Sequence, residues 1–392
     1  MSTRPTSAPG STAALRTANQ QRVLEVLRGR ASNGSEDDAA FTQAELARVT
    51  GLAPATVSNI VRELAAVQLV HAEPGAGRRG SAIRLARSAG LVAGVDFGHS
   101  HLAVAIGDLT GTLLAEERRP LDPGHLHREG LALAATLLHD MSAGLGEVRH
   151  AALGLPAPVT HDVVRATAIF PGWEGVDARA AAEEAFGVSV HVENDANLGA
   201  LAEHHQGVAR GHDTSVFVKI SSGVGAGIII DNKLFHGAGG SAGEIGHLTL
   251  DDQGPLCRCG SRGCLEAYTS VATVQSMMSE QLPTASLDDI VAAARGGNVS
   301  AQRTLEDAGL HLGWGLASIV NLLNPAVVVV GGDMARAGEL LLESARLGLR
   351  RHALDTVAST PVLASELGER ASLVGAVLLA AERTELLAPP LT

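Results

Sequence analysis

The sequence predicts an α/β protein in which a small helical module precedes a much larger body. From residue 90 onwards, short apolar runs typical of buried strands alternate with Ala- and Leu-rich stretches of helical composition. Such alternation is characteristic of helices packed on a sheet. Before residue 90, apolar residues recur mainly at helical spacing. A chain of 392 residues, 45% of them hydrophobic, is long enough for two or three domains with a large core.

Charge separates the same two parts. The net charge of −12 argues on its face against nucleic-acid binding. Residues 1–87, however, contain 11 Arg and no Lys against 7 acidic residues, whereas the remainder holds 19 basic and 35 acidic residues. An acidic body joined to a basic N-terminal part indicates that only the N-terminal part contacts phosphate groups.

The N-terminal part is predicted to be a winged helix-turn-helix domain. A Ser/Thr/Pro-rich tail over residues 1–17 is expected to be disordered, and the domain is expected to cover residues 18–87. The first helix is predicted over 19–30, and a polar insert over 31–40 forms a loop.

The second and third helices are predicted from the residues at their starts. Thr42, followed by Glu45 three residues later, has the spacing of a capping box that opens the second helix. Gly51 makes the turn, and Pro54 stands where a first helical turn tolerates proline. The third helix is predicted to end at about Val67.

The third helix has one apolar and one polar face. The residues spaced i, i+3, i+4 and i+7 are Val57, Ile60, Val61 and Leu64. The opposite face presents Thr56, Ser58, Asn59 and Arg62. Short polar and Arg side chains in this position suit base readout in the major groove. Two short strands follow, and Arg78 and Arg79 at their Gly-rich tip would contact phosphates as a basic wing. A helical protein-interaction module is the alternative.

All three cysteines of the chain lie in one short segment that follows a histidine. Zinc prefers thiolate and imidazole ligands, and a structural site uses four protein ligands. The predicted ligands are His247, Cys257, Cys259 and Cys264. Gly260 and Gly263 allow the tight loop that such spacing needs. The alternative is a mere cluster or a disulfide, but an odd cysteine count without a secretory signal argues against disulfides.

The same segment carries a family resemblance. The run Gly243-Glu244-Ile245-Gly246-His247, with the Cys-x-Cys-Gly-x-x-Gly-Cys-x-Glu run that starts at Cys257, resembles the signature of the ROK family. That family contains sugar kinases, sugar-responsive repressors and uncharacterised open reading frames. The resemblance implies a two-lobed body like that of actin, Hsp70 and the sugar kinases, with ligand in the cleft. The first lobe would comprise 90–198 plus 375–392, and 199–374 would form the second lobe with the zinc site.

The resemblance also implies a sugar site. Residues 193–197, Glu-Asn-Asp-Ala-Asn, match a ROK motif. By resemblance, the residues around the sugar hydroxyls would be Asn194, Asp195, Glu244, His247 and Glu266. Carboxylates accept hydrogen bonds from hydroxyl groups, and Asp195 would be the general base if the chain were a kinase. The alternative is that these are solvated surface acids.

Two Gly-containing turns stand where ROK kinases hold the phosphates of ATP. The residues of these vestigial loops are Asp96, Gly98, Ser100, Ser222, Gly223 and Gly225. His99 stands in the place of a Gly, His101 replaces a Lys, and Ser221 replaces another Gly of the kinase pattern. Side chains in such loops take the space and backbone freedom that phosphates need. These departures argue against binding of ATP and Mg²⁺, although each turn could also be a plain connection between strands.

Together these features predict a sugar-responsive transcriptional regulator, a repressor with a monosaccharide or sugar-derivative effector. Operator DNA would be palindromic and bound by a homodimer or homotetramer. The alternative is an ATP-dependent sugar kinase resembling hexokinase or glucokinase, or a bifunctional protein. No apolar run approaches the roughly 20 residues of a membrane-spanning helix, and the first residues lack the apolar core of a signal peptide. We therefore expect a cytoplasmic protein without membrane contact.

Overall fold

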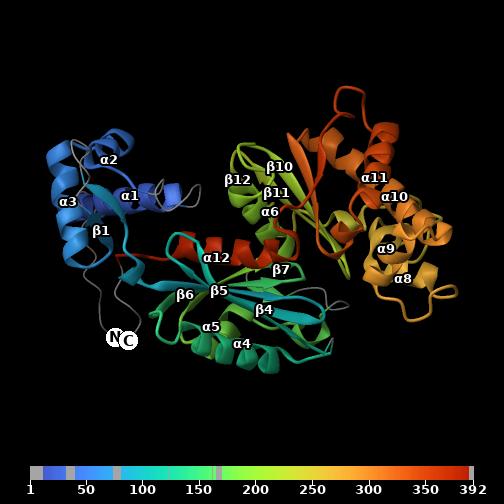
Figure 1. The fold of residues 1–392 in the computed structure, drawn as a ribbon, viewed down its shortest axis with the longest axis horizontal. Coiled ribbons are helices and arrows are strands. Elements are labelled where there is room, and N and C mark those ends of the chain that lie inside the picture. Colours follow the sequence, from blue (N-terminus) through green and yellow to red (C-terminus); the bar gives the residue numbers. More distant parts are fainter. Residues whose placement is uncertain are drawn as a thin grey trace.

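In a computed structural model, the chain forms an N-terminal module and a two-lobed α/β body (Figure 1). The structure describes residues 12–31, 40–73, 81–122, 124–160, 162–164 and 170–387. The module lies at one end of the molecule, the first lobe in the middle and the second lobe at the other end. In the described ranges, no helix has both the length and the hydropathy needed to cross a membrane.

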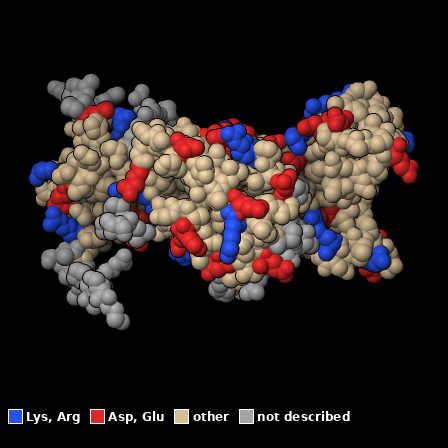
Figure 2. Space-filling model, turned by 90° about the horizontal axis from the view of Figure 1, so that it is seen from below, with Lys and Arg blue, Asp and Glu red and all other residues tan. Residues whose placement is uncertain are grey.

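The module has the predicted order of three helices followed by two strands. Its elements are α1 (Thr12–Ala31), α2 (Gln43–Thr50), α3 (Pro54–Ala66), β1 (Val70–Glu73) and β2 (Ala82–Leu85). β1 and β2 pair antiparallel. The capping box is confirmed, because the Glu45 N–H donates to Thr42 Oγ1 and the Thr42 N–H donates to Glu45 Oε2. The predicted apolar face of α3 is also confirmed: Val57, Ile60, Val61 and Leu64 are buried. Basic side chains stand at the outer end of the module, away from the body (Figure 2).

The first helix begins earlier than the sequence pattern indicated. α1 starts at Thr12, so helix replaces part of the tail expected over residues 1–17, of which residues 1–11 lie outside the described ranges. Contacts with α3 account for the extra turns. Gln20 Nε2 donates to Glu63 Oε2 at 2.8 Å, and Arg16 Nε donates to the same oxygen at 3.0 Å. Gln20 is 43 positions from Glu63 in the sequence, and Arg16 is 47 positions from it. Local periodicity cannot reveal contacts over such separations.

The body contains two five-stranded sheets with the same topology. The first consists of β3 (Leu91–Phe97), β4 (His101–Asp108), β5 (Leu113–Pro120), β6 (Val148–Leu155) and β9 (Ser189–Asn194). The second consists of β10 (Ser215–Ile220), β11 (Val224–Ile230), β12 (Lys233–Leu234), β13 (Val327–Gly331) and β14 (Val362–Ala364). The orders are β5-β4-β3-β6-β9 and β12-β11-β10-β13-β14. In each sheet an antiparallel three-stranded meander is followed by two parallel strands, so each lobe has its own sheet.

Helices cover both sheets. In the first lobe these are α4 (His127–Ser142) and α5 (Ala178–Phe186), which lie side by side on one face (Figure 1). The second lobe has α7 (Glu266–Thr269), α8 (Val271–Met278), α9 (Leu287–Arg295), α10 (Val299–Leu323) and α11 (Glu339–His352). A short hairpin, β7 (Val159–Thr160) with β8 (Val163–Val164), completes the first lobe.

Two helices pack against each other where the lobes meet. These are α6 (Asp195–Gln206) and α12 (Ala371–Arg383). Their backbones approach so closely that a Cβ on Gly375 would lie 1.9 Å from Leu198 O. The expected lobe boundaries, 198/199 and 374/375, fall inside these helices. Each helix is continuous, and α12 packs mainly on the first sheet, whereas α6 contacts the second sheet and also reaches the apolar cluster of the first sheet through Leu198 and Leu201. The lobe boundaries therefore stay predictions.

The module is attached to the body through the end of α12. Arg28 of α1 donates hydrogen bonds to Glu382 O at 2.8 Å and to Thr384 O at 3.0 Å. The last carbonyl groups of a helix have no partner within the helix, so a cation that binds them stabilises the helix end. Leu386, just beyond, belongs to the same apolar cluster as Leu24 and Leu27 of α1. Figure 1 shows α12 running from the module to the junction of the lobes.

Candidate ligand pocket and metal centre

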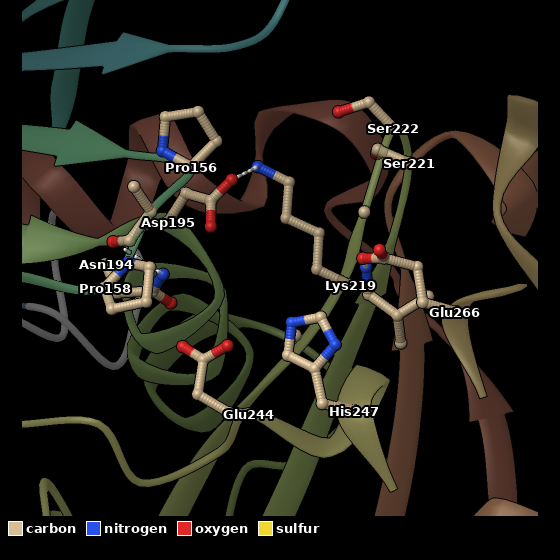
Figure 3. Close-up of a pocket in the computed structure, with 14 residues that line it drawn as sticks. Pro156, Pro158, Asn194, Asp195, Lys219, Ser221, Ser222, Glu244, His247 and Glu266 are labelled. Atoms are coloured by element: carbon tan, nitrogen blue, oxygen red, sulfur yellow. Dashed lines mark hydrogen bonds and ion pairs between the residues drawn. The ribbon is translucent and has the colours of Figure 1, made fainter. Parts of the chain in front are cut away.

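A pocket between the lobes brings together all the residues expected to bind sugar. Its lining includes Asn194, Asp195, Glu244, His247 and Glu266 (Figure 3). They come from the start of α6, from the turn Ile245–His247 with the residue before it, and from the start of α7. Carboxylate and imidazole groups from segments far apart in the sequence therefore face one space.

The start of α6 positions Asn194 and Asp195. The N–H of Ala196 donates to Asn194 Oδ1 at 2.9 Å, so Asn194 caps the helix. Asp195 is the first helical residue and is only 8% exposed. Its Oδ2 accepts a hydrogen bond from Lys219 Nζ at 2.7 Å. Burial raises the pKa of Asp195, whereas the Lys219 ammonium acts in the opposite direction.

Glu266 and Glu244 have different surroundings. Glu266 is buried, with Oε1 accepting from Arg258 Nε at 2.6 Å and Oε2 accepting from the Val224 N–H at 3.0 Å. Glu244 is half-buried, and burial together with the carboxylates of Asp195 and Glu266 raises the pKa of Glu244 to about 7. Near neutral pH, Glu244 therefore exists in both forms and can accept or donate a hydrogen bond, as sugar hydroxyl groups also can.

The predicted metal ligands form one cluster beside this pocket. The ligand atoms of His247, Cys257, Cys259 and Cys264 all lie within 4.8 Å of one another. Cys259 Sγ is 3.7 Å from Cys264 Sγ, and Cys257 Sγ is 3.8 Å from His247 Nδ1. A tetrahedral zinc ion with Zn–S bonds of about 2.3 Å places two sulfur ligands about 3.8 Å apart. The cluster is therefore compatible with one tetrahedral metal ion.

The loop that carries the cysteines depends on its glycines, as the sequence predicted. Gly260 and Gly263 adopt φ angles of 90° and 61°. At Gly263 a Cβ would also lie 1.6 Å from Asp251 O, so no side chain fits. The Cys257 N–H donates to Ser261 O at 2.8 Å and closes the turn.

The expected phosphate loops lie at two neighbouring cavities. Ser222, Gly223 and Gly225 line the ligand pocket itself, while Asp96 lines a second cavity beside it. Lys219 and Ser221 line both.

His101, rather than His99, lines the second cavity. A Cβ on Gly98 would lie 2.0 Å from His101 Cε1, so the imidazole covers this part of the loop. His101 Nε2 is 3.6 Å from Asp96 Oδ2, and Ser100 is exposed. The ring thus takes the space over the backbone that a phosphate would need.

Three residues near the pocket were not singled out from the sequence. Lys219 on β10 contacts Asp195, Ser372 on α12 contacts both, and Arg258 holds Glu266. The amino-acid composition could have drawn attention to Lys219. The chain contains only two lysines, Lys219 and Lys233, among its 30 basic residues.

The outer face of α3 is accessible. Asn59 and Arg62 are exposed, and Arg62 Nη1 donates to Asn59 Oδ1 at 3.3 Å, whereas Thr56 and Ser58 are half-buried. Arg78 and Arg79, expected at the tip of the wing, lie outside the described residues.

Known proteins share both the sequence and the architecture. A family model described as the ROK family matches residues 92–383. The chain is 29% identical over 351 residues to the xylose repressor of Bacillus subtilis (strain 168), covering 86% of this chain and 89% of that protein. It is 31% identical over 362 residues to the DNA-binding transcriptional dual regulator NagC of Escherichia coli (strain K12), covering 86% and 88%. A crystal structure of a ROK family transcriptional regulator, homologous to the E. coli MLC protein, matches with a TM-score of 0.78 at 25% identity, covering 95% of this chain and 98% of that one. The chain therefore belongs to the ROK family.

Proposed function

We propose that this chain is a sugar-responsive transcriptional repressor. Residues 18–87 bind operator DNA, and the pocket between the lobes binds a monosaccharide effector. The observation that carries this proposal is α12, because Ser372 at its start contacts the pocket residues Asp195 and Lys219, and Arg28 of the module binds the carbonyl groups at its other end. Relatives named as a xylose repressor and as the DNA-binding regulator NagC support the same role.

The pocket has the chemistry to bind vicinal hydroxyl groups. Asp195, Glu244 and Glu266 supply carboxylate oxygens from three directions, and His247 supplies a ring nitrogen. Because Nδ1 of His247 faces Cys257, its Nε2 is left for the pocket. Zinc bound by the cluster would fix this tautomer and hold the loop that positions Glu266.

A sugar panel and a truncation test the proposal. Operator DNA selected from genomic fragments by the full-length protein should not bind the body that lacks residues 1–87. D-xylose, D-glucose or N-acetyl-D-glucosamine should raise the melting temperature of the full-length chain, because a ligand that binds only the folded state stabilises it. If the truncated body bound the operator as well as the full chain, the proposal would fail.

Asn59→Ala is expected to relax the sequence preference of DNA binding. Asn59 is exposed on α3, where a side chain amide can contact a base edge. Loss of one such contact costs about 1–3 kcal/mol at one base position and changes specificity there. The measurement compares binding to the selected operator and to single-base variants of it. Arg16→Ala serves as control, since Arg16 contacts Glu63 within the module. Equal base preferences for Asn59→Ala and the unaltered protein would contradict base readout by Asn59.

A palindromic operator would require two modules. One recognition helix covers few base pairs, so we propose a homodimer, or a tetramer built from dimers, whose half-sites are separated by whole helical turns. Insertion of about five base pairs between the half-sites rotates one half-site relative to the other by half a helical turn. Binding of the full-length protein should then weaken strongly, while insertion of about ten base pairs should restore it.

The retained Asp195 favours the alternative of a sugar kinase. Phosphoryl transfer also needs the nucleotide phosphates aligned with the sugar hydroxyl, and His101 and Ser221 take space in the loops that would align them. We therefore expect no sugar-dependent ATP turnover at ordinary kinase rates of about 1–100 per second. A coupled assay for ADP measures this, and turnover in that range that Asp195→Ala abolishes would establish a bifunctional protein.

A further inference from the structure

Lys219 occupies the wall between the ligand pocket and the second cavity. It lines both cavities and lies at the lobe junction. Its Nζ donates to Asp195 Oδ2 at 2.7 Å and to Ser372 Oγ at 3.0 Å. Ser372 Oγ in turn donates to Asp195 O at 2.9 Å. One ammonium group thus joins β10, α6 and α12.

The surrounding carboxylates keep this lysine charged. The side chains of Lys219 and Asp195 are only 16% and 12% exposed. Burial alone would lower the pKa of Lys219, but the carboxylates of Asp195 and Asp96 outweigh it and raise the pKa. The ammonium is therefore permanent at neutral pH, and removal of either member of the pair would leave the other charge buried and unpaired.

The residue type fits the position. This chain uses arginine for nearly all its basic residues and has lysine only at Lys219 and Lys233. An ammonium group is a compact charge with three donors, whereas a guanidinium group is a planar fork. A compact group suits the contacts with Asp195 and Ser372, which come from different helices.

Charge balance at the pocket determines which ligands fit. Lys219 is compensated by Asp195 and Asp96, and Arg258 is compensated by Glu266. Glu244 adds a further carboxyl group. Among the described lining residues, no uncompensated Lys or Arg remains to receive a phosphate. The second oxygen of Asp195 faces the pocket, where it can accept a hydrogen bond (Figure 3).

We propose that Lys219 is a positioning and specificity-determining residue that holds Asp195 as a hydrogen-bond acceptor for a neutral, unphosphorylated monosaccharide. The same ammonium separates the sugar pocket from the second cavity, where Asp96 of the other expected phosphate loop lies, so the pocket receives the sugar without a nucleotide. This inference rests on the proposed function and names the class of effector. A sugar phosphate would bring two negative charges beside Asp195, Glu244 and Glu266 and would bind more weakly.

A double-mutant cycle tests the role of Lys219 in the full-length protein. The variants are Lys219→Met, Asp195→Asn and the double variant, and the control is Lys233→Met, which alters the exposed second lysine. Calorimetry gives the affinities for D-xylose, D-glucose and N-acetyl-D-glucosamine, and urea unfolding gives the stability. Each single variant should lower the affinity for the bound sugar at least tenfold. If Lys219 acts through Asp195, the double variant should be no weaker than the weaker single variant.

Unfolding supplies a readout that needs no sugar. The double variant should be more resistant to urea than the less stable single variant, because it leaves no unpaired charge. Lys219→Met could fail to fold while the double variant folds. That rescue would show the expected coupling between Lys219 and Asp195 in its strongest form. Additive effects in both measurements, or a sugar affinity of Lys219→Met equal to that of Lys233→Met, would overturn the role of Lys219.

Phosphorylated sugars test the ligand class. D-glucose 6-phosphate and N-acetyl-D-glucosamine 6-phosphate should bind at least tenfold more weakly than the parent sugars. If either sugar phosphate bound more tightly than its parent sugar, the assignment of a neutral, unphosphorylated ligand would be wrong. The proposed sugar-responsive function would still stand. If none of the sugars or their phosphates bound the unaltered protein, the proposed function itself would fail, together with the ligand class.

Discussion

Replacement of Cys264 by serine is expected to abolish metal binding and to remove most of the sugar affinity. Cys264 is buried, with its Sγ 3.7 Å from Cys259 Sγ. Serine is a poor ligand for zinc, and a three-ligand site would retain the ion weakly. The loop after Cys257 carries both Arg258 and Glu266, and these form an ion pair at 2.6 Å. Loss of the ion therefore frees two pocket residues at once, Glu266 and His247.

The expected loss of sugar affinity depends on how much of the structure the metal ion stabilises. Structural zinc contributes about 10–16 kcal/mol to the folding of small zinc peptides, which have little other core. Here the second lobe has a large apolar core of its own, so the lobe should fold without the ion while the loop does not. Loss of groups that orient a site costs on the order of 10–100-fold. With two pocket residues released, we expect the sugar affinity to fall by about 100-fold.

Metal analysis and calorimetry check this prediction. The unaltered protein, purified without chelator, should contain one zinc ion per chain, and Cys264→Ser should contain none. Ser261→Ala, at an exposed position in the same loop, should retain both zinc and sugar affinity because only the backbone oxygen of Ser261 closes the turn. Zinc-free unaltered protein, or full sugar affinity in Cys264→Ser, would show that the cluster does not support the pocket.

Local patterns were sufficient for some parts of the molecule and not for others. The capping box at Thr42 and the buried face of α3 depend on residues at most seven positions apart, so their spacing alone predicted them. The ligand cluster spans His247 to Cys264, and residue type restricts it further because the chain has no other cysteine. The two-lobed architecture came from the family resemblance, since strand pattern alone indicated only an α/β fold.

Features that depend on distant segments were missed. Lys219 and Asp195 are separated by 24 positions, and Ser372 and Asp195 by 177, so no local pattern joins them. The early start of α1 likewise depends on Glu63 of α3. The expected lobe boundaries fall inside α6 and α12, two continuous helices that pack on each other where the lobes meet. The contacts that make each helix continuous across a boundary also come from distant segments.

Arg28→Ala is expected to uncouple the ligand pocket from DNA binding while leaving each site intact. At the pocket, Ser372 at the start of α12 contacts Asp195 and Lys219. At the other end, Arg28 binds Glu382 O and Thr384 O. α12 has 13 residues and is therefore about 20 Å long. Sugar that draws the lobes together around Asp195 would move the start of α12, and a rigid helix would transmit this movement to α1.

In a dimer, such a movement changes the distance between two modules and hence the fit to a palindromic operator. A typical coupling free energy of about 1–3 kcal/mol corresponds to a change in operator affinity of about 5–150-fold. We expect sugar to release the operator, so that repression is relieved when the sugar is present. Linkage demands that operator DNA lower the sugar affinity by the same factor. Glu244→Ala should bind the operator normally and lose the response, because it removes a pocket carboxyl group far from the module.

Sugar titrations with and without operator measure the coupling directly. Arg28→Ala should show equal sugar affinities under both conditions and an operator affinity close to that of the unaltered protein without sugar. Arg22→Ala is the matched control, because Arg22 lies on the same helix but binds Thr50 O within the module, and it should keep the full coupling. Full coupling in Arg28→Ala would exclude the contact between α1 and α12 as the link. Equal sugar affinities with and without operator in the unaltered protein would exclude coupling altogether, because a ligand that does not distinguish two states cannot shift the equilibrium between them.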